Sequence, residues 1–174
     1  VHAATASGSF LMSARQDVAA PIIGVLTVEE VSNSTLVLKV TTDEPTTLDI
    51  RYGAGNLRQS TASTDYENEH IVVLGNLSSS KAYDIEVRAR DITGNLTTQQ
   101  LTDQVTASSA DTTPPGISSS PVIHRITNSE IRIDYATLEY ATSSARCERT
   151  DTGSRWTVGL EGLRRSHNVT LKGL

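Results

Sequence analysis

The feature that most limits what this chain can fold into is an internal repeat. The segment Asp-Val-Ala-Ala-Pro at 17–21 is matched 94 residues later by Asp-Thr-Thr-Pro-Pro at 111–115, and His70 is matched 97 residues later by His167. This period exceeds the roughly 20–50 residues of a solenoid unit and is the size of a self-contained domain. The sequence therefore predicts two related modules in series.

The repeat divides the chain into three parts. We expect an N-terminal extension at 1–16, a first module at 17–110 and a second module at 111–174. The second module stops at Leu174, the position equivalent to Leu77, and so lacks the last two strands that the first module supplies. A sandwich without them exposes part of its core and leaves strand edges unpaired, which proteins normally avoid.

Two routes would complete the second module. One is a longer chain with further modules on both sides, and the other is a strand given by another subunit, which would build a filament. Residues 10–17 align with residues 104–111 at the end of the first module, so the N-terminal extension reads as the last strand of a preceding module. Partners are therefore expected at β-edges, from neighbouring domains or from copies of the same protein.

Composition excludes several classes of function. With 37% hydrophobic and 20% charged residues among 174, the chain can bury one or two cores. The net charge of −5, with acids and bases interspersed, argues against nucleic-acid binding, which needs a concentrated basic face. No apolar run reaches the roughly 20 residues of a membrane-spanning helix, so membrane insertion is not expected. The single cysteine, Cys147, excludes an internal disulfide.

Short alternating runs predict strands and no helix. Residues 36–40 and 48–52 each place apolar side chains on one face, and residues 83–89 alternate most regularly between apolar and charged positions. Turn residues separate these runs at 43–45 and 91–95. Short strands at regular spacing predict an all-β fold of antiparallel sandwich type.

Leu77 and Tyr83 stand six residues apart at the entry to the most regular strand. In a Greek-key sandwich, a tyrosine at this place packs its ring inward and returns its hydroxyl to the backbone of the preceding corner. Tyr83 is in phase with Ile85 and Val87, so we expect its ring to face the core.

Several motifs follow one another in the first module. These are Thr-Thr-Asp-Glu-Pro at 41–45, Ile-Arg-Tyr-Gly at 50–53, the apolar run after His70, and Asp-Ile-Thr-Gly-Asn at 91–95 ahead of the next Asp-Thr-Thr-Pro-Pro. Their order resembles fibronectin type III domains, in the variety strung in tandem on bacterial and archaeal secreted and surface proteins. The resemblance implies immunoglobulin-like sandwiches of seven strands in two sheets, the second one incomplete here, and it implies no activity.

The second module follows the first strand by strand but has diverged. Ile131, Ile133, Tyr135, Ala145 and Cys147 match, in this order, Leu36, Leu38, Val40, Ile50 and Tyr52. Cys147 is therefore expected on the inward face as a buried, unreactive thiol. Trp156 follows the Asp-Thr-Gly turn at 151–153 and is the candidate surface aromatic. Pro114 and Pro115 predict a stiff, extended linker that sets the two modules in line with a small interface.

The sequence predicts no catalytic, cofactor or metal site. The four histidines are far apart, and the zinc-protease, nucleophile-elbow and phosphate-loop motifs do not occur. Asp43 with Glu44, or Asp91 with Asn95, offers the oxygen ligands that calcium uses, although solvated turn acids account for them better. We therefore do not expect an enzyme.

Four sequons are acceptor sites for N-glycans if the chain is exported. They begin at Asn33, Asn76, Asn95 and Asn168, each expected at a strand end or in a turn. A chain rich in Ser, Thr and Asn also produces sequons by chance, so they do not by themselves establish export.

Three functions from different classes fit these observations. The leading one is a non-catalytic structural or adhesion module of a larger extracellular or cell-surface protein, with a cell-surface carbohydrate or protein as partner. The second is a self-assembling, pilus-like filament subunit completed by strand exchange. The third is an accessory region of a secreted enzyme such as a carbohydrate-active hydrolase or phosphatase, for which an exposed platform of Trp156, Tyr66 and Tyr140 would favour carbohydrate binding.

Overall fold

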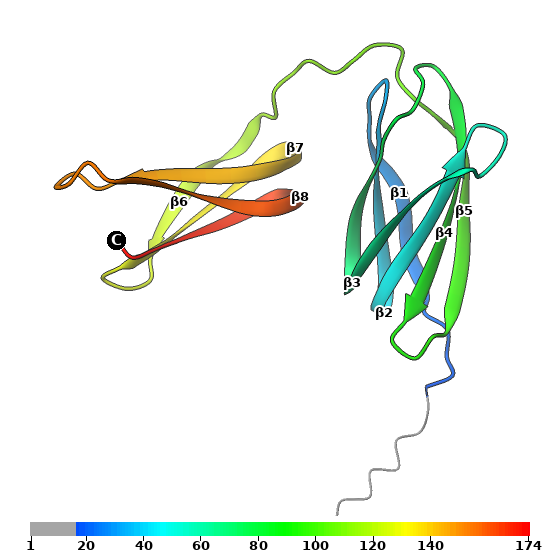
Figure 1. Ribbon diagram of the computed structural model, residues 1–174, viewed down its shortest axis with the longest axis horizontal. Helices are drawn as coiled ribbons and strands as arrows, with labels where there is room; N and C mark the ends of the chain where they lie inside the picture. Colours follow the sequence, from blue (N-terminus) through cyan, green and yellow to red (C-terminus); the bar gives the residue numbers. More distant parts are fainter. Residues whose placement is uncertain (1–16) are drawn as a thin grey trace, which may run out of the picture.

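The computed structural model describes residues 17–174, and every regular element in this part is a β-strand (Figure 1). The strands are β1 (Ile23–Val31), β2 (Leu36–Gly53), β3 (Gln59–Leu74), β4 (Ala82–Asp91), β5 (Leu96–Val105), β6 (Ile117–Arg125), β7 (Glu130–Glu148) and β8 (Arg155–Lys172). All strand pairs are antiparallel. In the described residues no helix is long and apolar enough to cross a membrane. The extension at 1–16, expected as a strand, lies outside the described residues.

The first five strands form one sheet that folds over on itself, because β2 and β3 change neighbours along their length. The first half of β2 pairs with β1 and with the end of β3, whereas its second half pairs with β4 and with the start of β3. Register shifts between Thr41 and Leu48 mark the change. β5 then pairs with the outer edge of β4. The two halves thus face each other across a common core.

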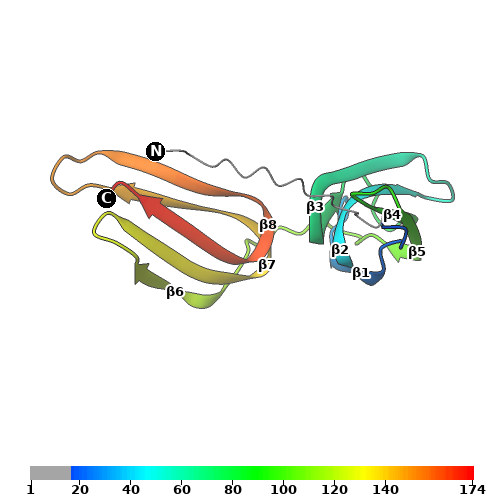
Figure 2. The same ribbon diagram turned by 90° about the horizontal axis from the view of Figure 1, so that it is seen from below.

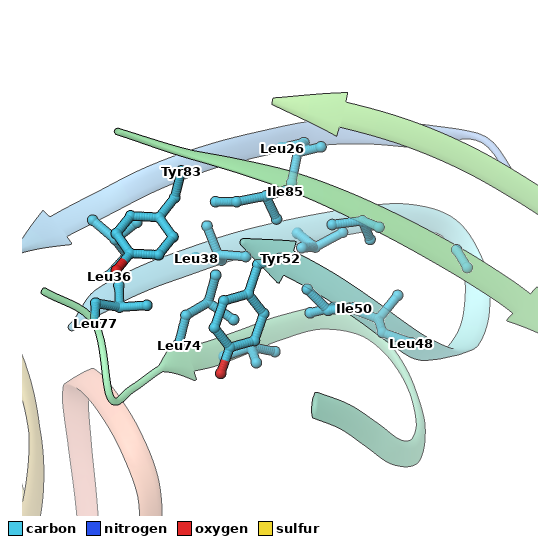
Figure 3. Close-up of a cluster of buried hydrophobic side chains, with 14 residues drawn as sticks. Leu26, Leu36, Leu38, Leu48, Ile50, Tyr52, Leu74, Leu77, Tyr83 and Ile85 are labelled. Atoms are coloured by element: carbon cyan, nitrogen blue, oxygen red, sulfur yellow. The ribbon is translucent and has the colours of Figure 1, made fainter. Parts of the chain in front are cut away.

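Figure 3 shows this core, which the alternating faces of the strands fill as their sequence predicts. Leu36, Leu38 and Val40 from the first half of β2 are fully buried, and Ile50 from its second half meets Ile85 and Val87 from β4 in the same cluster. The charged positions between the inward residues of β4 lie on the outer face, where Glu86 and Arg88 form an ion pair at 2.6 Å. Because apolar burial is the main favourable term in folding, this cluster holds the two halves together.

The turn expected at 43–45 is wrong, because β2 continues through these residues. The Thr42 hydroxyl donates to the Glu44 carbonyl oxygen at 2.8 Å and holds a local bend within the strand. Residues 43–45 have no ladder partner, so Pro45, which lacks an N–H, removes no inter-strand bond. The expected turn at 91–95 is present, with Gly94 at φ 98°.

The last three strands form a separate sheet in the order β6, β7, β8 (Figure 2). β7 and β8 are as long and as irregular as β2 and β3, with register shifts between Ala136 and Ser143. Two contacts recur in both sheets. Thr137 donates to the Glu139 carbonyl oxygen at 2.7 Å, as Thr42 does to that of Glu44. An aspartate also precedes each sheet and accepts the backbone N–H of the residue two positions later: Asp17 before the first sheet and Asp111 before the second.

Residues 106–116 link the sheets and are fixed at both ends. Thr106 donates its hydroxyl to the Ser78 carbonyl oxygen at 2.6 Å, and at the other end Leu138 donates its N–H to the Gly116 carbonyl oxygen at 2.8 Å. Pro114 and Pro115 lie exposed between these points. Figure 1 shows the strands of the second sheet running across the direction of those of the first, so the in-line arrangement expected from the prolines is wrong. Side-chain contacts between the sheets, described below, accompany this orientation.

Candidate functional site

Three carboxylates from distant parts of the chain meet at one end of the first sheet. Asp17 precedes β1, Glu44 lies in the bend of β2 and Asp91 ends β4, and one ligand atom from each lies within 4.8 Å of the others. The pairing of Thr46 with Asp91 brings the bend of β2 beside the end of β4. Among the described residues, these three form the group of possible ligands that could hold a metal ion.

The Asp91 carboxylate is held by its own turn. Its Oδ1 accepts the backbone N–H groups of Thr93, Gly94 and Asn95 at 2.6–2.9 Å, and its Oδ2 accepts the Asn95 side-chain amide at 2.7 Å. Burial alone would raise the pKa of Asp91, but the hydrogen bonds from Asn95, Thr93 and Gly94 outweigh it and lower the pKa. Both oxygens are already engaged, and this turn explains the residue without a metal.

Glu44 lies in the field of its neighbours. Burial, followed by the negative charges of Asp17, Asp91 and Asp43, raises the pKa of Glu44. Asp43 itself is not part of the group, and its carboxylate accepts the Ile22 N–H at 2.7 Å. Of the calcium ligands considered from the sequence, the structure therefore unites Glu44, Asp91 and Asn95, and it adds Asp17. Asp17 could not be predicted as a member of this group, because the sequence shows only that it is equivalent to Asp111.

The repeated histidines are structural. His70 is 1% exposed, and its Nδ1 and Nε2 lie 3.0 Å from the Ser63 hydroxyl and the Glu67 carbonyl oxygen. His167 is equally buried, has its Nε2 3.0 Å from the Thr137 hydroxyl, and stacks on Tyr135 with ring centroids 4.7 Å apart. Burial and then the charge of Arg164 lower the pKa of His167.

Tyr83 makes the contact that its position predicts. Its ring is buried beside Leu77, and its hydroxyl accepts the backbone N–H of Ser78 at 2.8 Å (Figure 3). The bond ties the turn after β3 to the start of β4.

A set of side chains joins the two sheets. Arg165 of β8 lies 3.2 Å from the Glu30 carboxylate and 3.7 Å from that of Glu29, both on β1, and its guanidinium stacks over the ring of Tyr140 at 4.6 Å. The backbone N–H of Tyr140 donates to Glu30 at 2.5 Å. A cleft of about 800 Å³ lies alongside, between Glu67 and Glu69 of β3 and the β8 residues 161–166. The Glu30 carboxylate thus accepts hydrogen bonds from the Arg165 side chain and from the Tyr140 backbone N–H of the second sheet.

Cys147 and Trp156 lie opposite each other on the inner face of the second sheet, where β7 pairs with β8. Both are half-buried. The cysteine is on the inward face that its position predicts but is not fully buried. Trp156 does not offer the exposed platform that a carbohydrate-binding surface would need.

The sequons differ in their surroundings. Asn33, Asn76 and Asn95 lie in turns, as expected, but Asn168 lies within β8, because it matches Ile71 of β3 rather than a turn. The Asn95 amide donates to Asp91, and a glycan there would disrupt this bond. Asn76 and Asn168 are exposed.

The sequence matches no family model, and no curated protein matches it.

Proposed function

We propose that the chain is a non-catalytic structural or adhesion module of a larger extracellular or cell-surface protein. Its parts would be two immunoglobulin-like domains of fibronectin type III, the second one incomplete. The observation that carries the proposal is the repetition of one strand unit on both sides of a linker fixed at its ends, with the same threonine bond to a glutamate carbonyl and a buried histidine at the same place in the register. Units of this kind serve to space and present other parts of a protein.

Two further features support the fibronectin type III assignment. If β2 and β3 are each counted as two strands at their register shifts, the first unit has seven strands around one core. The Tyr83 hydroxyl also closes the corner before β4, as the tyrosine of such sandwiches does.

The side chains between the sheets support a presenting role. Arg165 contacts Glu29, Glu30 and Tyr140 together, so the second unit is held at one orientation to the first by more than the linker alone. A spacer that fixes orientation presents its neighbours in a defined direction. The partners would be neighbouring domains, or a carbohydrate or protein at the cell surface.

The location is tested with antibody fragments raised against the folded chain and applied to intact and to permeabilised cells of its source. We expect binding to intact cells or recovery of the chain from the medium. Binding that requires permeabilisation, with nothing in the medium, would rule out an extracellular role. An intracellular reference protein must stay unlabelled on the intact cells.

A further inference from the structure

The second sheet has an open edge where the first sheet is closed. In the first sheet, β4 pairs with the second half of β2. The corresponding half of β7, residues 141–148, pairs with β8 alone among the described strands. Arg149 donates its N–H to the Ser154 carbonyl oxygen at 2.9 Å, toward the β8 side. Because bonding alternates along an antiparallel strand, Ser144, Arg146 and Glu148 direct their N–H and C=O groups to the open side.

The inner face beside this edge is apolar and partly uncovered. Ile50 and Tyr52 of β2, which pair with β4, are 0% and 7% exposed. Their equivalents on β7, Ala145 and Cys147, are smaller and only half-buried. The inner face therefore has a slot at Ala145 and Cys147 beside a row of free backbone groups. An exposed edge of this kind is a template for an added strand.

Residues 1–16, which lie outside the described part of the chain, have a sequence that fits an added strand. Leu11 precedes the start of β1 by twelve residues, as Val105 at the end of β5 precedes the start of β6. Residues 3–14 contain no proline and no acidic or basic residue, and they hold the chain's one Phe and one Met, Phe10 and Met12. In a strand these two side chains share one face. The segment thus supplies bulk where β7 lacks it.

We propose that the open edge of β7, residues 141–148, binds residues 2–12 of a second copy of the chain as an added strand, with Phe10 and Met12 over Ala145 and Cys147. The contact joins the segment before β1 of one copy to β7 of the next, so it propagates head to tail. It extends the proposed structural role from one chain to an assembly, and it is tested on the purified chain without reference to where the chain resides.

The test measures the association of the full chain by sedimentation velocity over a range of concentrations. We expect a ladder of oligomers that lengthens with concentration. Arg146→Pro removes an N–H that faces the open edge and leaves the bonds to β8, so it should weaken association at least about tenfold. Arg146→Ala keeps the N–H and should associate as the natural chain does.

A matched pair of variants tests the donor. Phe10→Asp places a charge in the slot and should abolish the ladder, whereas Ser9→Asp places the same charge on the opposite face and should preserve it. Far-UV circular dichroism and Trp156 fluorescence identify any variant that fails to fold. A ladder that persists in Phe10→Asp would overturn the proposal.

Cys147 gives a second readout that needs no variant of the acceptor. As the chain's one thiol, it reports directly on whether the slot is covered. Its reaction with an aromatic disulfide reagent should slow as the concentration of the natural chain rises and should stay fast in Phe10→Asp. A chain that remains monomeric with a reactive Cys147, or one that forms only a closed dimer insensitive to Phe10→Asp, would show that residues 2–12 are not the occupant.

Discussion

At the scale of single residues, the chain fixes its turns with short polar contacts. Asp91 gathers the backbone N–H groups of its own turn, and Tyr83 accepts the N–H of Ser78. Each contact satisfies backbone groups that would otherwise lose their hydrogen bonds on burial, which is costly. The contact of Glu44 with Asp17 and Asp91 is of another kind, because there the fold brings like charges together.

Tyr83→Phe removes one hydroxyl and keeps the ring. We expect the free energy of unfolding to fall by about 1 kcal/mol, because the Ser78 N–H loses its partner. Urea unfolding followed by circular dichroism measures the change. Tyr66→Phe, at a tyrosine that is 47% exposed, is the matched control and should unfold as the natural chain does. Equal effects of the two substitutions would show that the hydroxyl bond is not the cause.

Glu44→Gln should stabilise the chain at neutral pH. The raised pKa of Glu44 means that the folded state favours its protonated form, so its ionisation above this pKa destabilises the fold. The gain should shrink as the pH falls through the raised pKa and should be absent below about 4.3, the ordinary pKa of a glutamate, because both states are then protonated. Thermal unfolding across this pH range measures it.

Glu139→Gln is the control for Glu44→Gln, since Glu139 holds the equivalent bend of β7 and lies outside the acidic group. It should show no such pH-dependent gain.

Added calcium chloride should not shift the unfolding temperature of the natural chain, because the Asp91 oxygens are already engaged. A calcium-dependent rise that Glu44→Gln abolishes would instead identify a cation site.

At the scale of elements, the two sheets show what β4 contributes. Leu38 of β2 and Ile133 of β7 are equivalent, yet Leu38 is fully buried and Ile133 is half-buried. In the first sheet, β4 and β5 close the second side of the core. The second sheet has no equivalents of these two strands among the described residues. Apolar burial, and with it the stabilisation it supplies, is therefore divided unequally between the sheets.

Leu38→Ala should cost roughly 2–5 kcal/mol, as fully buried leucines do, and Ile133→Ala should cost clearly less. Urea unfolding should be followed by circular dichroism for the whole chain and by fluorescence for the second sheet, which contains the one tryptophan, Trp156. Measurements at a concentration where the chain is monomeric keep the comparison clean. Equal costs would mean that the inner face of β7 is as well covered as that of β2.

The inward faces of the strands could be predicted from sequence because side chains alternate with period two, and Leu36, Ile50 and Ile85 obey this rule. The continuity of β2 through residues 43–45 could not, because Glu-Pro there is also a turn signal, and only the register of β1, β3 and β4 shows that no bond is needed. The grouping of Asp17 with Glu44 and Asp91 escaped prediction because it depends on three segments distant in sequence. The contact between Glu30 and Arg165 could not be predicted from the sequence for the same reason.

At the scale of the whole molecule, Arg165 is the residue that relates one sheet to the other. Its partners Glu29 and Glu30 are partly buried, but Arg165 itself is 41% exposed. Exposed ion pairs contribute about 0–1 kcal/mol. The ion pair alone therefore adds little to stability, and it acts on orientation together with the stacking on Tyr140 and the bond from the Tyr140 N–H to Glu30.

Arg165→Glu should loosen the orientation of the two sheets without unfolding either. Small-angle X-ray scattering should show a broader distribution of distances between the sheets, while the circular dichroism spectrum stays unchanged. Glu30→Arg added to Arg165→Glu restores opposite charges and should narrow the distribution again. High salt should reproduce part of the single variant's effect, because screening weakens the pair. A natural chain that already shows the broad distribution would contradict the contact.

The chain enters the first sheet at Asp17 and leaves it past Val105, at opposite ends of its strands (Figure 1). Tension applied through the chain would therefore act along the strands. Inter-strand hydrogen bonds lie perpendicular to the strands, so such a pull loads many of them at once instead of opening them one after another. The linker bond from Thr106 to Ser78 transfers the load into the turn that Tyr83 braces. The first sheet is thus built as a tether that resists sudden force better than its modest core would suggest.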